Sequence, residues 1–359
     1  MNKKFYTRFL LCVVAALSIT TSVHAQAPAN SLPALPECDA ILYVNMRRII
    51  SEALPRILPA DKYAEMKTGL EDIKRKSGID VDGFESGVLA LRFNKPITAP
   101  PEFVLLVRGS FNADALLSLA RIGLQGKVRE EKYGSKSISI FKLSDLMGAG
   151  EAKFLPSGIN DMAATALNGG TLAVGNIPYV KATIDAESGE KRVSPELMAL
   201  AMRDPGALMS LAIVIPEGMV SGLLPKEMQG NDEIFKIISG IENFYLSVGM
   251  NATEFPISAS VRTASAEHAR TLNGLLEMGL HAAASQIPDK KAQSIVDALK
   301  ITAEGSEVQV QMPIPQETVA MLIREANKPK PEVKDKSASQ PGAKAKPATR
   351  RKQSRAKKP

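Results

Sequence analysis

The sequence predicts an α+β protein made of two similar units, with mostly antiparallel sheets, helices packed on one face and a disordered C-terminal tail. Alternating apolar segments joined by short turns, such as Asn168-Gly169, indicate β-hairpins. Helical segments with an apolar period near 3.6 residues lie between the hairpins. The same order of elements then recurs in the second half of the chain. Hairpins with interspersed helices favour antiparallel sheets over a doubly wound parallel sheet.

The first unit is predicted over residues 38–204. Asn112 has the residue type and position of a helix N-cap, and Phe111 before it can pack on Leu116 as a hydrophobic staple. The predicted strands are residues 40–45, 87–93, 103–108, 128–132, 137–143, 164–167 and 171–175. The predicted helices are residues 47–57, 62–76, the segment after Asn112, and segments opened by Pro178 and Pro195.

The second unit is predicted over residues 205–327. Strand 257–262 before a helix corresponds to strand 103–108, and the hairpin over Glu304-Gly305 corresponds to the hairpin over Asn168-Gly169. We interpret these matches as a diverged duplication. The predicted strands are residues 207–215, 244–251, 257–262, 301–303 and 307–311. The predicted helices are residues 217–224, 232–239, 266–286, 292–299 and a last helix from Pro315 to about Asn327.

The N-terminus has the features of a secretory signal peptide over residues 1–25. A basic start is followed by an apolar run over 9–17, which is too short to span a bilayer. Val23-His24-Ala25 places small residues at the usual positions, so we expect cleavage after Ala25. Residues 26–37 then form a leader rich in Pro and Ala. These features predict a periplasmic or secreted protein with no membrane span after cleavage.

The C-terminal tail, residues 328–359, contains 12 Lys and Arg residues, two acidic residues and no aromatic residue. Such a segment buries too little apolar surface to fold, so we expect disorder. Of the formal charge of +7, the tail carries +10 and the signal +3, which leaves −6 for residues 26–327. A basic nucleic-acid-binding domain is therefore disfavoured. The tail residues expected to contact an anionic partner are Lys344, Lys346, Arg350, Arg351, Lys352, Arg355, Lys357 and Lys358.

Residues with metal-binding chemistry are sparse in the mature sequence. His268 and His281 lie on one predicted helix about 20 Å apart, so they cannot share an ion. Cys38 has no histidine near it in the sequence. The segment Asp80-Val-Asp-Gly lacks two ligands that a calcium loop requires, and we interpret it as a helix-to-strand turn. The sequence therefore predicts neither a metal site nor a cofactor site.

Catalytic motifs are also lacking. The sequence contains no Gly-x-Ser-x-Gly elbow, no Walker A motif and no dinucleotide fingerprint, and Lys67-Thr68-Gly69 lies in the wrong context for a penicillin-binding enzyme. Glu130 and Glu131 are neighbours on a predicted strand and should point to opposite faces. Without Trp, stacking platforms for carbohydrate are scarce. We therefore predict no catalytic residue.

Three segments give the chain a resemblance to a known group of proteins. They are Ala40-Ile-Leu-Tyr-Val-Asn-Met-Arg-Arg-Ile-Ile50, Arg129-Glu-Glu-Lys-Tyr133 and Ala201-Met-Arg-Asp-Pro205. In these segments the chain resembles uncharacterised exported bacterial proteins of the sort predicted in Acidobacteria-like genomes. The resemblance covers most of residues 38–315, excludes the tail, and implies export and a shared fold without any activity.

Taken together, these observations predict an exported, non-enzymatic binding or scaffolding protein of the cell envelope. The tail would tether it to an anionic envelope polymer or to an acidic protein surface, although contact with its own acidic body, or no role at all, stays open. One alternative is an envelope hydrolase whose site is assembled from dispersed residues. Another is a periplasmic, chaperone-like peptide binder that uses an open sheet edge or groove, which an uncovered apolar groove between the halves would favour.

Overall fold

The computed structural model describes residues 32–78, 80–94, 99–146, 160–216, 219, 232–284, 293 and 296–326. The predicted signal peptide and the predicted basic tail lie outside these residues. The predicted helix 217–224 also lies outside them except for residue 219, and so do residues 292, 294 and 295 of the predicted helix 292–299.

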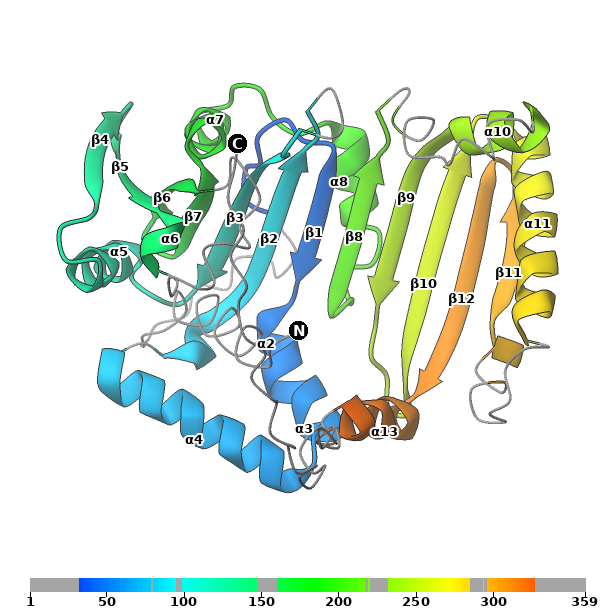
Figure 1. Ribbon diagram of the computed structural model, residues 1–359, viewed down its shortest axis with the longest axis horizontal. Helices are drawn as coiled ribbons and strands as arrows, with labels where there is room; N and C mark the ends of the chain where they lie inside the picture. The colour runs from blue at the N-terminus through cyan, green and yellow to red at the C-terminus, as the bar shows by residue number, and fades with distance from the viewer. Residues whose placement is uncertain are drawn as a thin grey trace, which may run out of the picture.

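The described strands form a single 12-stranded sheet in which every pair is antiparallel, so the two predicted units join in one sheet (Figure 1). The strand order is β11-β12-β10-β9-β8-β1-β2-β3-β7-β6-β5-β4. The strands are β1 (Ala40–Val44), β2 (Phe84–Arg92), β3 (Glu102–Gly109), β4 (Arg129–Tyr133), β5 (Lys136–Lys142), β6 (Asp161–Asn168), β7 (Thr171–Asn176), β8 (Met209–Val214), β9 (Ile241–Val248), β10 (Glu254–Thr263), β11 (Lys300–Glu304) and β12 (Glu307–Pro315).

The helices confirm the predicted α+β class and most of the predicted helical segments. They are α2 (Met46–Arg48), a π-helical turn (Ile49–Ala53), α3 (Leu54–Ile57), α4 (Ala60–Ser77), a 3₁₀ turn (Val81–Gly83), α5 (Ala113–Gly123), α6 (Leu143–Leu146), α7 (Ile177–Glu187), α8 (Pro195–Ala201), α10 (Asp232–Ser239), α11 (Ala266–Ala284) and α13 (Gln316–Ala326). In Figure 1, α4, α3 and α13 lie at one end of the strands, and α11 lies beside the edge strand β11.

The pair β1·β8 lies at the centre of the sheet and joins the two halves. Leu42 of β1 is paired with Leu211 of β8. From this pair outward, the order is β1-β2-β3-β7-β6 on one side and β8-β9-β10-β12-β11 on the other. The hairpin β4–β5 extends only the first half. This arrangement is what the predicted duplication requires, and the duplication itself stays a prediction.

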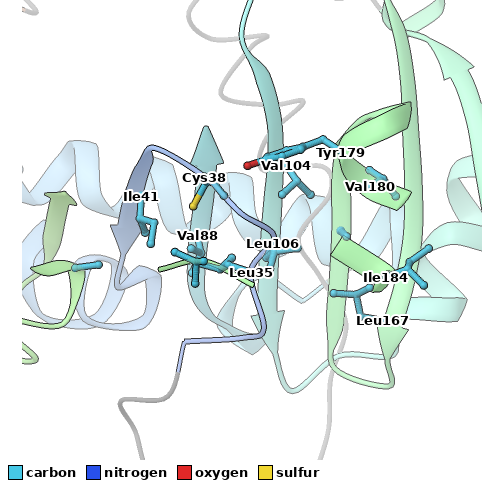
Figure 2. Packing of buried hydrophobic residues seen from close by; sticks show 14 of the residues in the cluster. Leu35, Cys38, Ile41, Val88, Val104, Leu106, Leu167, Tyr179, Val180 and Ile184 are labelled. Atoms are coloured by element: carbon cyan, nitrogen blue, oxygen red, sulfur yellow. The ribbon is translucent and has the colours of Figure 1, made fainter. Parts of the chain in front are cut away.

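One face of the sheet packs against α7 and α8, and we call it the α7 face. Val104 and Leu106 of β3 are each at most 1% exposed there. They share a core with Tyr179 and Val180 of α7, as Figure 2 shows. Leu35 of the predicted leader is fully buried in the same core, so the folded body begins before residue 38.

The other face, which we call the α5 face, packs against α5 at one end of the sheet. Leu105 and Val107 point to it because they alternate with Val104 and Leu106 along β3. Val107 packs with Leu116 and Leu117 of α5 in a second core.

Helix α11 lies on the same face as α5. At the other end of the sheet, α11 contacts β10, β11 and β12, and Val308 on this face is fully buried. The expected packing of helices on one face thus holds for α5 and α11. Helices α7 and α8 cover the opposite face.

Local sequence signals place α5 and the neighbouring hairpin where the sequence predicted them. The Asn112 side chain accepts a hydrogen bond from the backbone N–H of Ala115 at 3.0 Å and so caps α5. The side chain of Asn168 accepts from the N–H of Gly170 at 3.1 Å in the turn between β6 and β7. Phe111 and Leu116 are both buried in the core of the α5 face, as the staple predicts.

Candidate functional site: the open face of the sheet

Strands β8 and β9 have an inverted burial pattern. Their polar side chains Ser210, Asn243 and Ser247 lie on the α7 face and are at most 5% exposed. The alternating apolar side chains, among them Leu211 and Leu246, lie on the α5 face and are only half-buried. A sheet normally buries its apolar face, whereas here the apolar side chains are less buried than the polar ones opposite them.

This apolar surface extends over five neighbouring strands at the centre of the sheet, and we call it the open face. Its middle row is four leucines in register, Leu89, Leu42, Leu211 and Leu246, on β2, β1, β8 and β9. The full set, half-buried throughout, is Leu42, Val44, Leu89, Leu91, Met209, Leu211, Ile213, Phe244, Leu246, Val248 and Ile257. Since every member is aliphatic or aromatic, the open face offers no side-chain hydrogen-bond donor or acceptor.

Helices cover the α5 face on both sides of the open face. Helix α5 packs at the first-half end and α11 at the second-half end. At the end of the strands where α3 and α13 lie, Ile49 and Ile57 pack with Leu208 and Phe255 in a small third core. Apolar side chains also remain exposed on both flanking helices, including Ile122 of α5 at 74% and Met278 of α11 at 65%. The open face therefore lies between covered regions of one continuous sheet.

On the α7 face, polar side chains of β10 and β12 are bridged by Arg203. The Arg203 guanidinium donates to Ser260 Oγ at 2.6 Å and to Glu307 Oε1 at 2.6 Å, and it lies 5.6 Å from the centre of the Tyr245 ring. These contacts tie the segment after α8 to β9, β10 and β12. Helix α8 packs on this side of β8, opposite the side that carries Leu211.

A cavity of about 330 Å³ lies where β1 begins and β2 ends, at the low end of the range for small-molecule sites. Asp39 accepts from the N–H of Phe93 at 2.7 Å, and the carbonyl of Glu37 accepts from the hydroxyl of Tyr179 at 2.6 Å. Both contacts anchor the start of β1 to neighbouring elements. The lining residues are Glu37, Cys38, Asp39, Arg92, Phe93, Asn94 and Pro216.

Cys38, beside this cavity, is 8% exposed and is not an activated nucleophile. Burial, with smaller effects of Asp39 and Glu37, raises the pKa of its thiol from 9.0 to about 12. The folded state therefore holds the thiol proton more tightly than the unfolded state. The contribution of Cys38 to the stability of the folded state is complete below pH 9.0 and is lost as the pH rises towards about 12.

We expect the Cys38 thiol of the mature folded chain to react at pH 8 with a disulfide reagent about a hundredfold or more slower than in denaturant, because the thiolate is scarce and shielded. The release of the chromophoric thiol, followed with and without guanidinium, measures both rates. Equal rates in the two states would show that Cys38 is accessible and ionised in the folded protein.

His268 and His281 lie on α11, as predicted, and their ring nitrogens have different neighbours. His281 Nδ1 lies 2.7 Å from the carbonyl oxygen of Glu277, one turn earlier. His268 packs close to Gly240, where an added Cβ would lie 3.1 Å from its Nδ1. Among the described residues, no group of three or more His, Cys, Asp or Glu side chains could hold a metal ion.

The remaining acidic candidates have structural partners. Asp80 is 4% exposed, accepts from the N–H of Asp82 at 3.1 Å and pairs with Lys74 at 2.5 Å, which confirms the predicted helix-to-strand turn. Glu130 and Glu131 point to opposite faces, also as predicted. Glu130 pairs with Arg121 of α5 at 2.9 Å, and Glu131 pairs with Lys181 of α7 at 2.5 Å.

The sequence did not single out the open face, and the structure does not describe the tail. The eight basic tail residues from Lys344 to Lys358 lie outside the described residues, so the structure brings none of them near another site. Among the helices that the structure describes, none combines the length and the apolar character needed to cross a bilayer.

Comparisons with known proteins place the chain in no family. No protein-family model matches it, and no curated protein matches it. Three crystal forms of TP0453 are similar in structure, each at 14% sequence identity and each covering 82% of this chain. The TM-scores are 0.44 for form III, 0.43 for form IV and 0.38 for form I. The match covers 99%, 97% and 98% of the respective TP0453 chains.

Proposed function

We propose that this protein is an exported, non-enzymatic binding protein of the cell envelope that receives an apolar group of a partner on the open face. The observation that carries the proposal is the inverted burial of β8 and β9, where Ser210 and Ser247 are buried and Leu211 and Leu246 are only partly buried. Leaving a row of leucines in contact with water is unfavourable unless a partner covers them for part of the protein's life. This proposal is nearest to the chaperone-like alternative.

The chemistry of the described residues supports binding over catalysis. The Cys38 thiol is held protonated by burial, and the open face consists of apolar side chains alone. The charged residues nearest to the cavity at the start of β1 include Asp39, which accepts from the backbone of Phe93. An acid–base or nucleophilic mechanism needs convergent polar groups of matched pKa, and an apolar binding surface needs none.

Binding of Nile red, a neutral apolar fluorophore, tests the proposed function on the mature chain. We expect the double variant Leu211→Thr/Leu246→Thr to bind the dye about tenfold more weakly, because it removes apolar contacts worth about 1.4 kcal/mol. Threonine retains β propensity, so the strands should persist. The matched control is Leu322→Thr on α13, a helix that contacts α3 and β12, where Leu322 is 52% exposed. Equal losses in both variants, or no binding by the wild type, would contradict the proposal.

A second role rests on the charge of the tail, +10 over residues 328–359 against −6 for residues 26–327. We propose that the tail tethers the protein to anionic envelope material through sequence-independent, salt-sensitive contacts.

We expect deletion of residues 328–359 to abolish the retention of the protein on envelope fractions at low salt, because the deletion removes a charge of +10. Sedimentation of those fractions at increasing NaCl measures retention, and the full mature chain is the control. Retention that is unchanged by the deletion would exclude the tether and leave the role of the open face intact.

A further inference from the structure

We propose that the natural occupant of the open face is a single amphipathic α-helix of a partner protein. The inference rests on the proposed function and specifies the partner's secondary structure, which the proposed function leaves open. Three observations carry it: the chemistry of the open face, its size, and the way in which the same sheet is covered on either side of it.

The chemistry of the open face excludes an extended peptide. Each strand of the face is already paired on both sides, as β1 is with β2 and β8, so no backbone group is free to pair with an added strand. An extended segment lying on leucines would bury its own N–H and C=O groups without partners, which is costly. A helix satisfies its backbone internally and presents only side chains to the surface.

The size of the open face fits a helix better than a second copy of the chain. Five strands spaced about 4.8 Å apart span about 24 Å, and five residues along a strand span about 17 Å. The floor therefore measures about 400 Å², whereas each partner in a standard protein interface buries about 800 Å². A helix is about 10 Å across, and 12 to 16 residues of helix are about 18 to 24 Å long, so one helix fits within this outline.

The protein covers the rest of this face with its own helices. Leu116 and Leu117 of α5 pack on the first-half end, and α11 contacts β10, β11 and β12 at the second-half end. Both are amphipathic segments laid against aliphatic side chains such as Val107 and Val308. A partner helix on the leucine row would continue this layer between α5 and α11.

The test uses a synthetic 18-residue peptide with Leu at i, i+3, i+4 and i+7 spacing and balanced Glu and Lys elsewhere, so that it carries no net charge. The control peptide has the same composition with strict alternation of Leu and polar residues. Calorimetric titration into the mature chain measures affinity, and circular dichroism measures the helix gained on mixing. We expect the helical peptide to bind, to gain helix, and to bind at least about tenfold more weakly to Leu211→Thr/Leu246→Thr than to Leu322→Thr.

Three outcomes would overturn the inference while sparing the proposed function. In the first, the alternating peptide binds more tightly than the helical peptide. In the second, a fatty acid binds and neither peptide does. In the third, sedimentation equilibrium shows a dimer of the wild type, and the double variant Leu211→Thr/Leu246→Thr is a monomer. Nile red binding that depends on Leu211 and Leu246 would persist in each of these cases. If this dye binding is absent, the proposed function itself fails. Phe244→Thr, tested in parallel, keeps the experiment decisive if the double variant does not fold.

Discussion

Gly175→Ala should destabilise the protein by about 3 kcal/mol, because the strands β3 and β7 leave no room for a side chain at this position. A Cβ at Gly175 would lie 2.1 Å from the carbonyl oxygen of Phe103 and 2.8 Å from Cα of Val104. Both are backbone atoms of a strand paired on either side, so relief requires a shift of β3 itself. Chemical denaturation of the mature chain, followed by circular dichroism, measures the change.

Gly274→Ala is the matched control for this prediction. Gly274 lies on α11, and an added Cβ would find no atom within 4 Å. Alanine has the higher helix propensity, so this substitution should stabilise the protein by about 0.5–1 kcal/mol. If both substitutions had the same sign, close approach of β3 and β7 at Gly175 would not be the reason for glycine there.

Leu106→Ala and Leu246→Ala should differ in cost, although both remove the same atoms from a central strand. Leu106 is 1% exposed in the core of the α7 face, so its truncation leaves a cavity and should cost about 2–5 kcal/mol. Leu246 is half-buried on the open face. Water can fill the space that it leaves, so we expect a cost below about 1.5 kcal/mol.

Urea denaturation of the two variants, measured side by side, decides this prediction. The slope of the unfolding free energy against urea should match the wild type for both, since neither variant changes the extent of the folded sheet. An equal cost for Leu246→Ala and Leu106→Ala would mean that the open face is packed in the free protein. The proposed binding function would then lose the observation on which it rests.

Elements specified by short-range signals were predictable from the sequence. Asn112 caps α5, the Asn168-Gly169 turn closes β6 and β7, and Pro178 and Pro195 each lie in the first turn of a helix. Each of these signals acts within about four residues, so one sequence is enough to interpret it.

The continuity of the sheet was not predictable, because it depends on pairs distant in sequence. The pairing of β1 with β8 places Leu42 beside Leu211, and the sequence of neither strand indicates which strand it pairs with. The contacts of the leader were not predictable either. Leu35 is fully buried, and the N–H of Glu37 donates to the carbonyl of Lys191 at 2.9 Å, a contact that no local pattern indicates.

The open face could not be found from alternation alone, for a physical reason. Alternation of Ser210 with Leu211, and of Ser247 with Leu246, normally predicts that the leucines face the core. Here α8 covers the serine side, and Arg203 satisfies Ser260 beside them. The position of α8 depends on the path of the chain after α7, which the alternation does not encode.

The central position of β1 has a consequence for how the molecule folds. β1 is the first strand to be synthesised, but its partner β8 begins only at Met209. Pairing across so long a stretch of chain is slow, because the entropy of closing the intervening loop must be lost first, so β1 waits for that partner with one edge unpaired. During this interval the exposed edge is a template for pairing with other chains. The pairing of β1 with β8 is therefore the folding step at which the chain is most prone to aggregate. Variants that slow the formation of β8 should lower the yield of soluble protein more than they lower its equilibrium stability.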